Sequence, residues 1–278
     1  MFFTENDIDR WIEEDIPYID LTTTLTDFSK DRLNIKYTAR DSITLSACEA
    51  AVRVLEKAGC TVLSARRSGD SVSAGELIIE AEGTPQAVHT GWRVSLNLME
   101  YSSGIATRTK KLVTAAKAVN PDIVVSGTRK AFPGTRRLSV QALMAGGAVP
   151  HRLGLSETVL FFSAHYDNAG GLDALLEKMP EIRLKCLEKK IEIELEKLSD
   201  IEKAVKAGVD SIQTDKMTPS QVAETVKLVK VLNPAVKVLA AGGISIDNAA
   251  EYAATGADML VTSWMYFGKP ADIKASIS

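Results

Sequence analysis

Two hydrophobic patterns follow one another along the chain. From about residue 104 to the C-terminus, short apolar runs recur at regular spacing, with helical patterns between them. Repeated βα units of this length predict a parallel sheet, and this many in succession favour a complete or broken α/β barrel, with a doubly wound open sheet as the alternative. The predicted strands are Ile123–Ser126, Val159–Phe162, Ile191–Leu195, Ser211–Thr214, Val236–Ala240 and Met259–Thr262.

Capping patterns mark helices between these strands. The predicted helices open at Ser199 with Glu202, at Thr218 with Gln221 and at Ser245, and they end at Gly208, Asn233 and Gly256.

The N-terminal part is predicted to form a small α+β layer. Its first helix is capped by Thr4 with Asp7, and the acidic, hydroxyl-rich stretch Glu14–Thr23 reads as a loop. The remaining predictions are strands at Leu33–Ala39, Thr61–Ala65 and Glu76–Glu82, a helix from the box Ser46–Glu49 to Gly59, and a longer helix from Thr84-Pro85 to Ser102–Gly104.

Composition narrows the class of protein. The 278 residues are 45% hydrophobic and 25% charged, as in ordinary globular proteins. A formal net charge of −3 argues against a nucleic-acid binder, which needs a broadly basic surface. Three cysteines without a CxxC pattern indicate neither a disulfide framework nor a thiolate metal site. The N-terminus lacks a signal-peptide pattern and no segment is apolar enough to span a membrane, so we expect a cytoplasmic protein.

The most concentrated charge lies in Gly127–Arg137, directly after the first strand of the βα region. Four cations fall in this stretch and a Pro133-Gly134 turn interrupts them. Arginine forks and lysine point charges suit carboxylates and phosphates, so the stretch predicts an anion site, although a solvated basic turn would have the same composition. The cations are Arg129, Lys130, Arg136 and Arg137.

Polar residues end most of the predicted strands. In a barrel the carboxyl ends of the strands meet at one face, where ligands bind, so these side chains should converge. They are Thr128, Arg129 and Lys130 after the first strand, Glu192 and Glu194 in the third, Asp215 and Lys216 after the fourth, Gly242 and Gly243 after the fifth, and Thr262 and Ser263 at the sixth; His151 and Arg152 precede the second strand.

Two of these groups suggest particular chemistry. The glycines of Ala240–Ser245 let a backbone at the start of a helix approach a phosphate, although a tight turn alone could use them. Glu194 and Asp215 could hold Mg²⁺ and ribose hydroxyls or stabilise a developing cation. Together with the Arg and Lys residues, they indicate a phosphorylated sugar and an anionic acceptor. No nucleophile-elbow, Walker or HEXXH motif is present.

Several of these motifs, in this order, resemble the quinolinate phosphoribosyltransferase family, and most closely its branch encoded with molybdate transporters, ModD. The resemblance covers nearly the whole chain. It rests on DLTTT at Asp20–Thr24, WRVSLNLMEYSSGIAT at Trp92–Thr107, GTRKAFPGTR at Gly127–Arg136, HRLGLSE at His151–Glu157, IEIELE at Ile191–Glu196, the strand end at Asp215, and AAGGI at Ala240–Ile244.

The resemblance implies an α/β sandwich domain over residues 1–103, followed by an open α/β barrel over 104–278 whose last residues can return to the first domain. It implies a homodimer, or a higher oligomer, with shared active sites. The donor would be phosphoribosyl pyrophosphate with Mg²⁺. The implied roles are acceptor recognition by Arg93 of the neighbouring subunit with Arg129, His151 and Arg152, donor-phosphate contact by Lys130, Gly242 and Gly243, and ribose and metal contact by Glu194 and Asp215.

The chain also departs from the quinolinate enzymes. Phe162 stands where they carry a lysine, Ala164 and Lys216 each stand where they carry an asparagine, and Trp92 replaces an acidic residue. An aromatic ring in place of a cation should weaken recognition of a dicarboxylate. We therefore expect a ModD-like pyrophosphorylase with a retained donor site and a small anionic or aromatic acceptor other than quinolinate. The alternatives are a true quinolinate phosphoribosyltransferase of NAD synthesis and a non-catalytic binder of molybdate or a phosphorylated metabolite.

Overall fold

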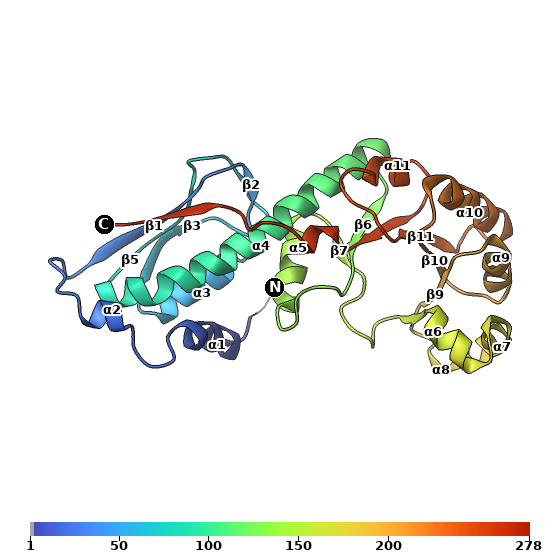
Figure 1. Ribbon diagram of the computed structural model, residues 1–278, viewed down its shortest axis with the longest axis horizontal. Helices are drawn as coiled ribbons and strands as arrows, with labels where there is room; N and C mark the ends of the chain where they lie inside the picture. Colours follow the sequence, from blue (N-terminus) through green and yellow to red (C-terminus); the bar gives the residue numbers. More distant parts are fainter. Residues whose placement is uncertain (1–2) are drawn as a thin grey trace. The chain divides into compact units, whose positions relative to one another are not determined.

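The computed structural model describes residues 3–278, which divide into two compact units (Figure 1). The first comprises residues up to Lys110, Ala131–Gly147 and Met265–Ser278, and the second comprises Lys111–Lys130 and Ala148–Trp264. One helix, α4 (Pro85–Val119), runs from the first unit into the second, so the boundary predicted at residue 103 lies inside a helix. No helix among the described residues has the length and apolar character needed to cross a membrane.

The first unit is built on an antiparallel sheet in the order β13-β1-β5-β3. Its core contains Tyr37, Leu55, Ile79 and Met99, contributed by the sheet, α3 and α4. The elements of this unit are α1 (Glu5–Asp15), α2 (Leu21–Thr24), β1 (Leu33–Ala39), β2 (Ile43–Thr44), α3 (Cys48–Lys57), β3 (Thr61–Ala65), β4 (Ser71–Val72), β5 (Leu77–Gly83), the first part of α4, α5 (Arg136–Ala145) and β13 (Ile273–Ile277).

The second unit contains a seven-stranded parallel sheet in the order β7-β6-β12-β11-β10-β9-β8. The sheet curls but stays open between β7 and β8, which confirms the predicted open α/β barrel. The strands are β6 (Val124–Gly127), β7 (Val149–Pro150), β8 (Val159–Phe161), β9 (Ile191–Leu195), β10 (Ser211–Asp215), β11 (Lys237–Ala241) and β12 (Met259–Thr262). The helices are α6 (Ser163–Tyr166), α7 (Leu172–Glu177), α8 (Met179–Lys185), α9 (Leu198–Lys206), α10 (Pro219–Leu232) and α11 (Ala249–Ala253), with short 3₁₀ turns at Asp167–Ala169 and Trp264–Tyr266.

Alternation along β9 separates its two faces. Ile191, Ile193 and Leu195 are almost fully buried, and α9 packs against this strand. Glu192 and Glu194 alternate with them and therefore lie on the opposite face, inside the curled sheet. The strand thus directs two carboxylates toward the interior of the barrel.

Two predictions about element boundaries were wrong. The stretch predicted as a loop contains the short helix α2, because Asp20 accepts a hydrogen bond from the Thr23 backbone N–H at 3.1 Å. Helix α4 continues past Ser102–Gly104 to Val119, because a glycine inside a helix weakens it without ending it when tertiary contacts support it. Gly104 lies against the backbone of Lys269, Pro270 and Ala271, where a Cβ would not fit.

Two predicted capping boxes also do not form. Helix α3 is preceded by Ala47 in a left-handed conformation, and the Glu49 carboxylate instead accepts from the Ser68 backbone N–H at 2.9 Å. Helix α9 begins at Leu198, so Ser199 lies inside it. The boxes at Thr4 and Thr218 are confirmed. Each of these boxes therefore identified a helix, but only those at Thr4 and Thr218 identified its first residue.

Candidate active site

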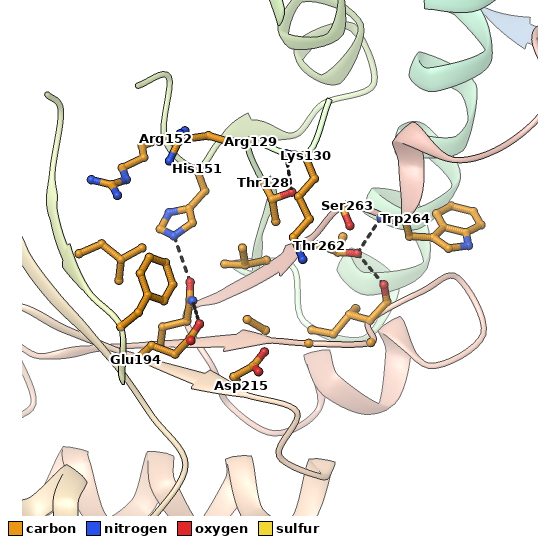
Figure 2. A pocket seen from close by; sticks show the side chains of 18 of the residues that line it. Thr128, Arg129, Lys130, His151, Arg152, Glu194, Asp215, Thr262, Ser263 and Trp264 are labelled. Carbon is orange, nitrogen blue, oxygen red and sulfur yellow. Dashed lines mark hydrogen bonds between the residues drawn. The ribbon is translucent and has the colours of Figure 1, made fainter. Parts of the chain in front are cut away.

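A cavity of about 590 Å³ lies at the carboxyl ends of the parallel strands (Figure 2). All of its lining residues belong to the second unit. The polar ones are Thr128, Arg129 and Lys130 after β6, His151 and Arg152 after β7, Glu194 on β9, Gln213 and Asp215 on β10, Gly242, Gly243 and Ser245 after β11, and Thr262 and Ser263 at β12. The structure therefore brings together most of the predicted site residues, whereas Arg93, Glu192 and Lys216 do not line the cavity.

Besides Lys216, three of the predicted cations do not line this cavity. Arg93 is exposed on α4 in the first unit, and its guanidinium lies 4.0 Å from the centre of the Trp92 ring. Arg136 and Arg137 begin α5, and Arg137 forms an ion pair with Asp7. Of the four cations in Gly127–Arg137, the cavity is therefore lined by Arg129 and Lys130, because the Pro133-Gly134 turn leads into a helix that belongs to the first unit.

The cationic side of the cavity is formed by the segments after β6 and β7. Arg152 is held by a 2.6 Å hydrogen bond from Nη1 to the Thr158 carbonyl oxygen. Burial and the nearby charge of Arg129 lower the pKa of Arg152. Each guanidinium group increases the positive potential at the other. This potential favours the binding of an anionic ligand between the two groups.

Carboxylates form the opposite side of the cavity. Burial raises the pKa of Glu194, and the charges of Asp215, Glu196 and Glu192 raise it further, while a hydrogen bond donated by Gln213 Nε2 opposes these effects. Lys216 Nζ lies 3.6 Å from Asp215 Oδ2. The cavity thus has an arginine-rich side and an acidic side, an arrangement that can hold an anion next to a developing positive charge.

Buried polar groups link the two sides. His151 Nε2 lies 3.1 Å from Gln213 Oε1 and 3.3 Å from Glu192 Oε1, and Glu192 is only 4% exposed (a dashed line marks the hydrogen bond at His151 in Figure 2). Burial lowers the pKa of His151, but the Glu192 carboxylate and the Gln213 hydrogen bond outweigh it, so the net pKa is raised. His151 therefore gains protons more readily than a free imidazole.

The loop after β11 approaches the acidic side closely. A Cβ on Gly242 would lie 2.4 Å from the Lys216 backbone nitrogen and 2.6 Å from Asp215 Oδ1, whereas nothing lies within 4 Å of that position on Gly243. Both glycines have positive φ, at 86° and 74°. Gly242 packs the loop against β10, and Gly243 leaves its backbone open to a ligand.

The helix predicted to start at Ser245 begins only at Ala249. The segment before it is held by the side chain of Asn248 instead of by a helical turn. Asn248 Oδ1 accepts a hydrogen bond from the Ser245 backbone N–H at 2.9 Å, and Nδ2 donates to the Gly243 carbonyl oxygen at 3.1 Å. The predicted helix-dipole contribution to phosphate binding was therefore wrong. Any phosphate contact here would come from the glycine backbone itself.

Replacing Gly242 and Gly243 separately tests the loop. We expect Gly242→Ala to weaken the binding of phosphoribosyl pyrophosphate more than tenfold, because its methyl group would displace the backbone of β10. Gly243→Ala carries only the cost of a positive φ, on the order of 1 kcal/mol. Isothermal titration of the donor would measure both. Equal losses in the two variants would contradict the close packing of Gly242.

An apolar patch adjoins the cationic side. Phe162 follows β8 and lines the cavity together with the buried Leu160. The Phe162 ring stacks on His165 with a 5.8 Å centroid separation, and His165 Nδ1 accepts the Phe162 backbone N–H at 3.0 Å. The aromatic ring is therefore fixed in orientation where it meets the cavity.

Glu194 and Asp215 have the chemistry expected for a magnesium complex of a phosphorylated substrate. Mg²⁺ is commonly bound by one or two carboxylates together with substrate phosphates and water. The raised pKa of Glu194, caused by burial and then by Asp215, indicates that positive charge would be favoured here. No cluster of three or more acidic, histidine or cysteine ligands occurs among residues 3–278, so a site held by protein ligands alone is not indicated.

Sequence reasoning overlooked Gln213 and Trp264. Gln213 could have been found from the period of two in β10, since it lies on the same face as Asp215. Its Cα pairs in register with that of Glu194 on β9, which explains their contact. Trp264 follows β12 in a 3₁₀ turn, and its backbone N–H donates a hydrogen bond to Thr262 Oγ1 at 3.0 Å. Nothing in the sequence pattern indicated that turn.

Sequence profiles of known families match both parts of the chain. The profile of the quinolinate phosphoribosyl transferase N-terminal domain matches residues 20–103, and that of the C-terminal domain matches residues 105–275. The chain belongs to the quinolinate phosphoribosyltransferase family. The family uses phosphoribosyl pyrophosphate and an acceptor, so a phosphoribosyltransferase of this type is indicated.

Curated members of the family carry two different names. A "Putative pyrophosphorylase ModD" of Rhodobacter capsulatus is 40% identical over 241 residues, covering 86% of this chain and 92% of the relative. A "Probable nicotinate-nucleotide pyrophosphorylase [carboxylating]" of Archaeoglobus fulgidus is 30% identical, covering 79% of this chain and 84% of the relative. Both relatives therefore match most of the chain.

Solved structures of family members share the fold. NadC from Streptococcus pyogenes superposes with a TM-score of 0.90 at 23% identity, over 100% of this chain and 99% of its own. The nicotinate-nucleotide pyrophosphorylase from Francisella tularensis gives a TM-score of 0.89 at 23% identity, over 99% and 98% of the two chains. At these identities the likeness establishes the fold alone.

Proposed function

We propose that this protein transfers a phosphoribosyl group from phosphoribosyl pyrophosphate to an acceptor other than quinolinate, with Mg²⁺ and with release of pyrophosphate. The observation that carries the proposal is the composition of the cavity. Its acidic and glycine-rich side has the groups that a sugar phosphate needs, whereas its acceptor side has Phe162 where quinolinate enzymes carry a lysine. The name of a relative, putative pyrophosphorylase ModD, supports the pyrophosphate-releasing part of the proposal.

The donor would lie along β9, β10 and the loop after β11. The open backbone at Gly243 suits the 5′-phosphate, and Lys130 suits the pyrophosphate as a point charge. Glu194 and Asp215 would hold the ribose hydroxyls and Mg²⁺, which would neutralise the leaving pyrophosphate. Ser263 lines the cavity and offers a further hydroxyl to a phosphate.

The transfer would proceed without a protein nucleophile. As the bond from C1 to pyrophosphate lengthens, the ribosyl ring gains positive charge, and the carboxylates of Glu194 and Asp215 stabilise that charge. The acceptor nitrogen then forms its bond to C1 from the opposite side. Arg129, His151 and Arg152 would position the acceptor, so catalysis rests on orientation and on fixed charge.

The acceptor should be less anionic than quinolinate. Phe162 and Leu160 offer apolar contact, which favours an aromatic ring and leaves one carboxylate of a dicarboxylate without its cation. Two arginines and a histidine remain to bind a single anionic group. An aromatic monoacid with a ring nitrogen fits this set best.

The decisive experiment measures pyrophosphate release from phosphoribosyl pyrophosphate and Mg²⁺ with quinolinate, nicotinate and other aromatic monoacids, with Arg129→Ala as the blank. We expect release with a monoacid and little with quinolinate. Phe162→Lys should raise kcat/KM for quinolinate at least tenfold, the effect of about 1.4 kcal/mol from one restored charged contact. Leu160→Met is the matched control, since it changes the same apolar patch without adding charge.

Other results would select another function. Rapid release with quinolinate and formation of carbon dioxide by the unaltered protein would make it an enzyme of NAD synthesis. Saturable donor binding without pyrophosphate release for any of the tested acceptors would favour a non-catalytic binder. Tight binding of molybdate would support a binding function further. Either result would refute the proposed acceptor change.

A further inference from the structure

Gln213 occupies the centre of the polar network in the cavity, although it carries no charge. It is 5% exposed, lies on β10 between Ser211 and Asp215, and contributes both of its polar atoms to hydrogen bonds. Its Nε2 donates to Glu194 Oε2, and its Oε1 lies 3.1 Å from His151 Nε2. A buried amide with both ends satisfied has one orientation.

That orientation determines which nitrogen of His151 carries a proton. An ionised carboxylate only accepts hydrogen bonds, so Glu194 requires the amide nitrogen and the amide oxygen must face His151. The Glu192 oxygen that lies 3.3 Å from the same Nε2 has no hydrogen bond of its own. Two acceptors therefore face Nε2, which must be the protonated nitrogen of the neutral ring. Nδ1 makes no hydrogen bond within the described part of the chain.

We propose that Gln213 is a positioning residue of this site, which holds His151 as the Nε2–H tautomer and fixes the Glu194 carboxylate, so that the acceptor side and the ribose side are oriented by one amide. The register of the sheet makes this possible. Gln213 and Glu194 are Cα partners on adjacent strands, whereas His151 follows β7 and reaches Gln213 across the interior of the curled sheet.

The orientation of His151 determines which of its nitrogens can meet the acceptor. With Nε2 directed at Gln213 and Glu192, the atom of His151 left for a ligand is Nδ1, which carries a lone pair in the neutral ring. The neutral ring then accepts a hydrogen bond from an O–H or N–H of the acceptor, and the protonated ring donates to an anionic group. Gln213 thereby acts on acceptor recognition without touching the acceptor. This part rests on the proposed function.

The first test measures the tautomer directly. The protein has three histidines, so ¹⁵N-histidine NMR spectra are simple, and the His151→Gln variant assigns the His151 signals. We expect the Nε2–H tautomer of neutral His151 in the unaltered protein and in Gln213→Glu, which keeps an acceptor facing the ring. Gln213→Met keeps the length of the side chain but removes both bonds. The remaining Glu192 oxygen lies 3.3 Å from Nε2 without forming a hydrogen bond, so the population of the Nε2–H tautomer should fall and a mixture should appear. An unchanged tautomer in Gln213→Met would overturn the proposal.

The neighbour of Gln213 on β10 provides a matched control. Thr214 is fully buried on the same strand and donates to the Leu239 carbonyl at 3.3 Å, on the face away from the cavity. Thr214→Val removes a buried hydroxyl at constant shape and should leave the His151 spectrum as it is. If Thr214→Val changes that spectrum as much as Gln213→Met does, the effect is general disturbance of β10 and the proposal fails.

The second test uses kinetics with the acceptor that supports release. Gln213→Met should raise the acceptor KM about tenfold, as for the loss of an oriented hydrogen-bonding group at His151. It should also lower kcat, because it releases the Glu194 carboxylate, whose charge is needed most in the transition state, while the donor KM changes less than twofold. Gln213→Glu should lower kcat, because a second carboxylate would adjoin Glu194. Equal changes in both KM values would contradict the proposal. The NMR result stands even if no acceptor supports turnover, so failure of the proposed function and failure of this inference are distinguishable.

Discussion

Asp215→Asn should lower kcat about 100-fold while the dissociation constant of phosphoribosyl pyrophosphate changes less than threefold. The substitution keeps the shape of the side chain, which matters because Asp215 packs against the backbone position of Gly242. What it removes is a negative charge at the cavity, next to the ribosyl ring of the proposed complex. That charge is needed most when the ring becomes cationic, and asparagine keeps an oxygen for a ribose hydroxyl or Mg²⁺, so the loss should be much larger in turnover than in ground-state binding.

Pyrophosphate release under saturating donor and isothermal titration of the donor give the two quantities. Glu196→Gln is the control, because Glu196 directly follows β9, is exposed and does not line the cavity. It should change kcat less than twofold. A donor affinity that falls as much as kcat in Asp215→Asn would assign Asp215 to binding, and an unchanged kcat would remove it from the mechanism.

The barrel strands were predictable because they are buried on one face against helices and are bounded by turns. Predicted and observed strands agree within one residue at Ile191–Leu195 and Met259–Thr262. The strands β7 and β13 were missed. A two-residue strand such as Val149–Pro150 has no periodicity to detect. For β13, the pairing with β1 depends on a contact between opposite ends of the chain, which local pattern does not contain.

The cavity was predictable for a different reason. The carboxyl ends of parallel strands meet at one face whatever the details of packing, so Glu194, Asp215, Arg129 and Gly243 could be grouped before their distances were known. Closeness in the sequence predicted the lining of the cavity less well. Arg136 follows Arg129 closely in the chain but lies on a helix of the other unit.

Register and side-chain orientation could not be derived from the sequence. The bond between Gln213 and Glu194 depends on the alignment of β10 with β9, and a slip of one residue would turn Gln213 away from the cavity. The approach of His151 depends on how far the sheet curls. The sequence therefore predicts which residues meet, whereas hydrogen-bond partners and tautomers require the folded structure.

A mixture of two inactive variants should regain activity if the active site is shared between subunits. Arg93 is exposed, lies in the first unit and does not line the cavity, yet the family resemblance gives it an acceptor contact in the partner's site. We propose that the protein is a homodimer with shared sites. Arg93→Ala and Asp215→Asn should each lose most turnover, because each removes one component of every site.

Refolding the two variants together at equal amounts produces heterodimers in half of the molecules, and in each heterodimer one site carries both substitutions and the other carries neither. The mixture should therefore recover about a quarter of the unaltered turnover. Arg93→Ala mixed with Arg129→Ala should recover the same fraction, since Arg129 also lies in the cavity. Asp215→Asn mixed with Arg129→Ala should recover nothing, because both belong to one subunit's cavity and every heterodimer site lacks one of them. Recovery in that last mixture, or none with Arg93→Ala, would refute the shared site, because complementation requires that Arg93 and the cavity belong to different chains.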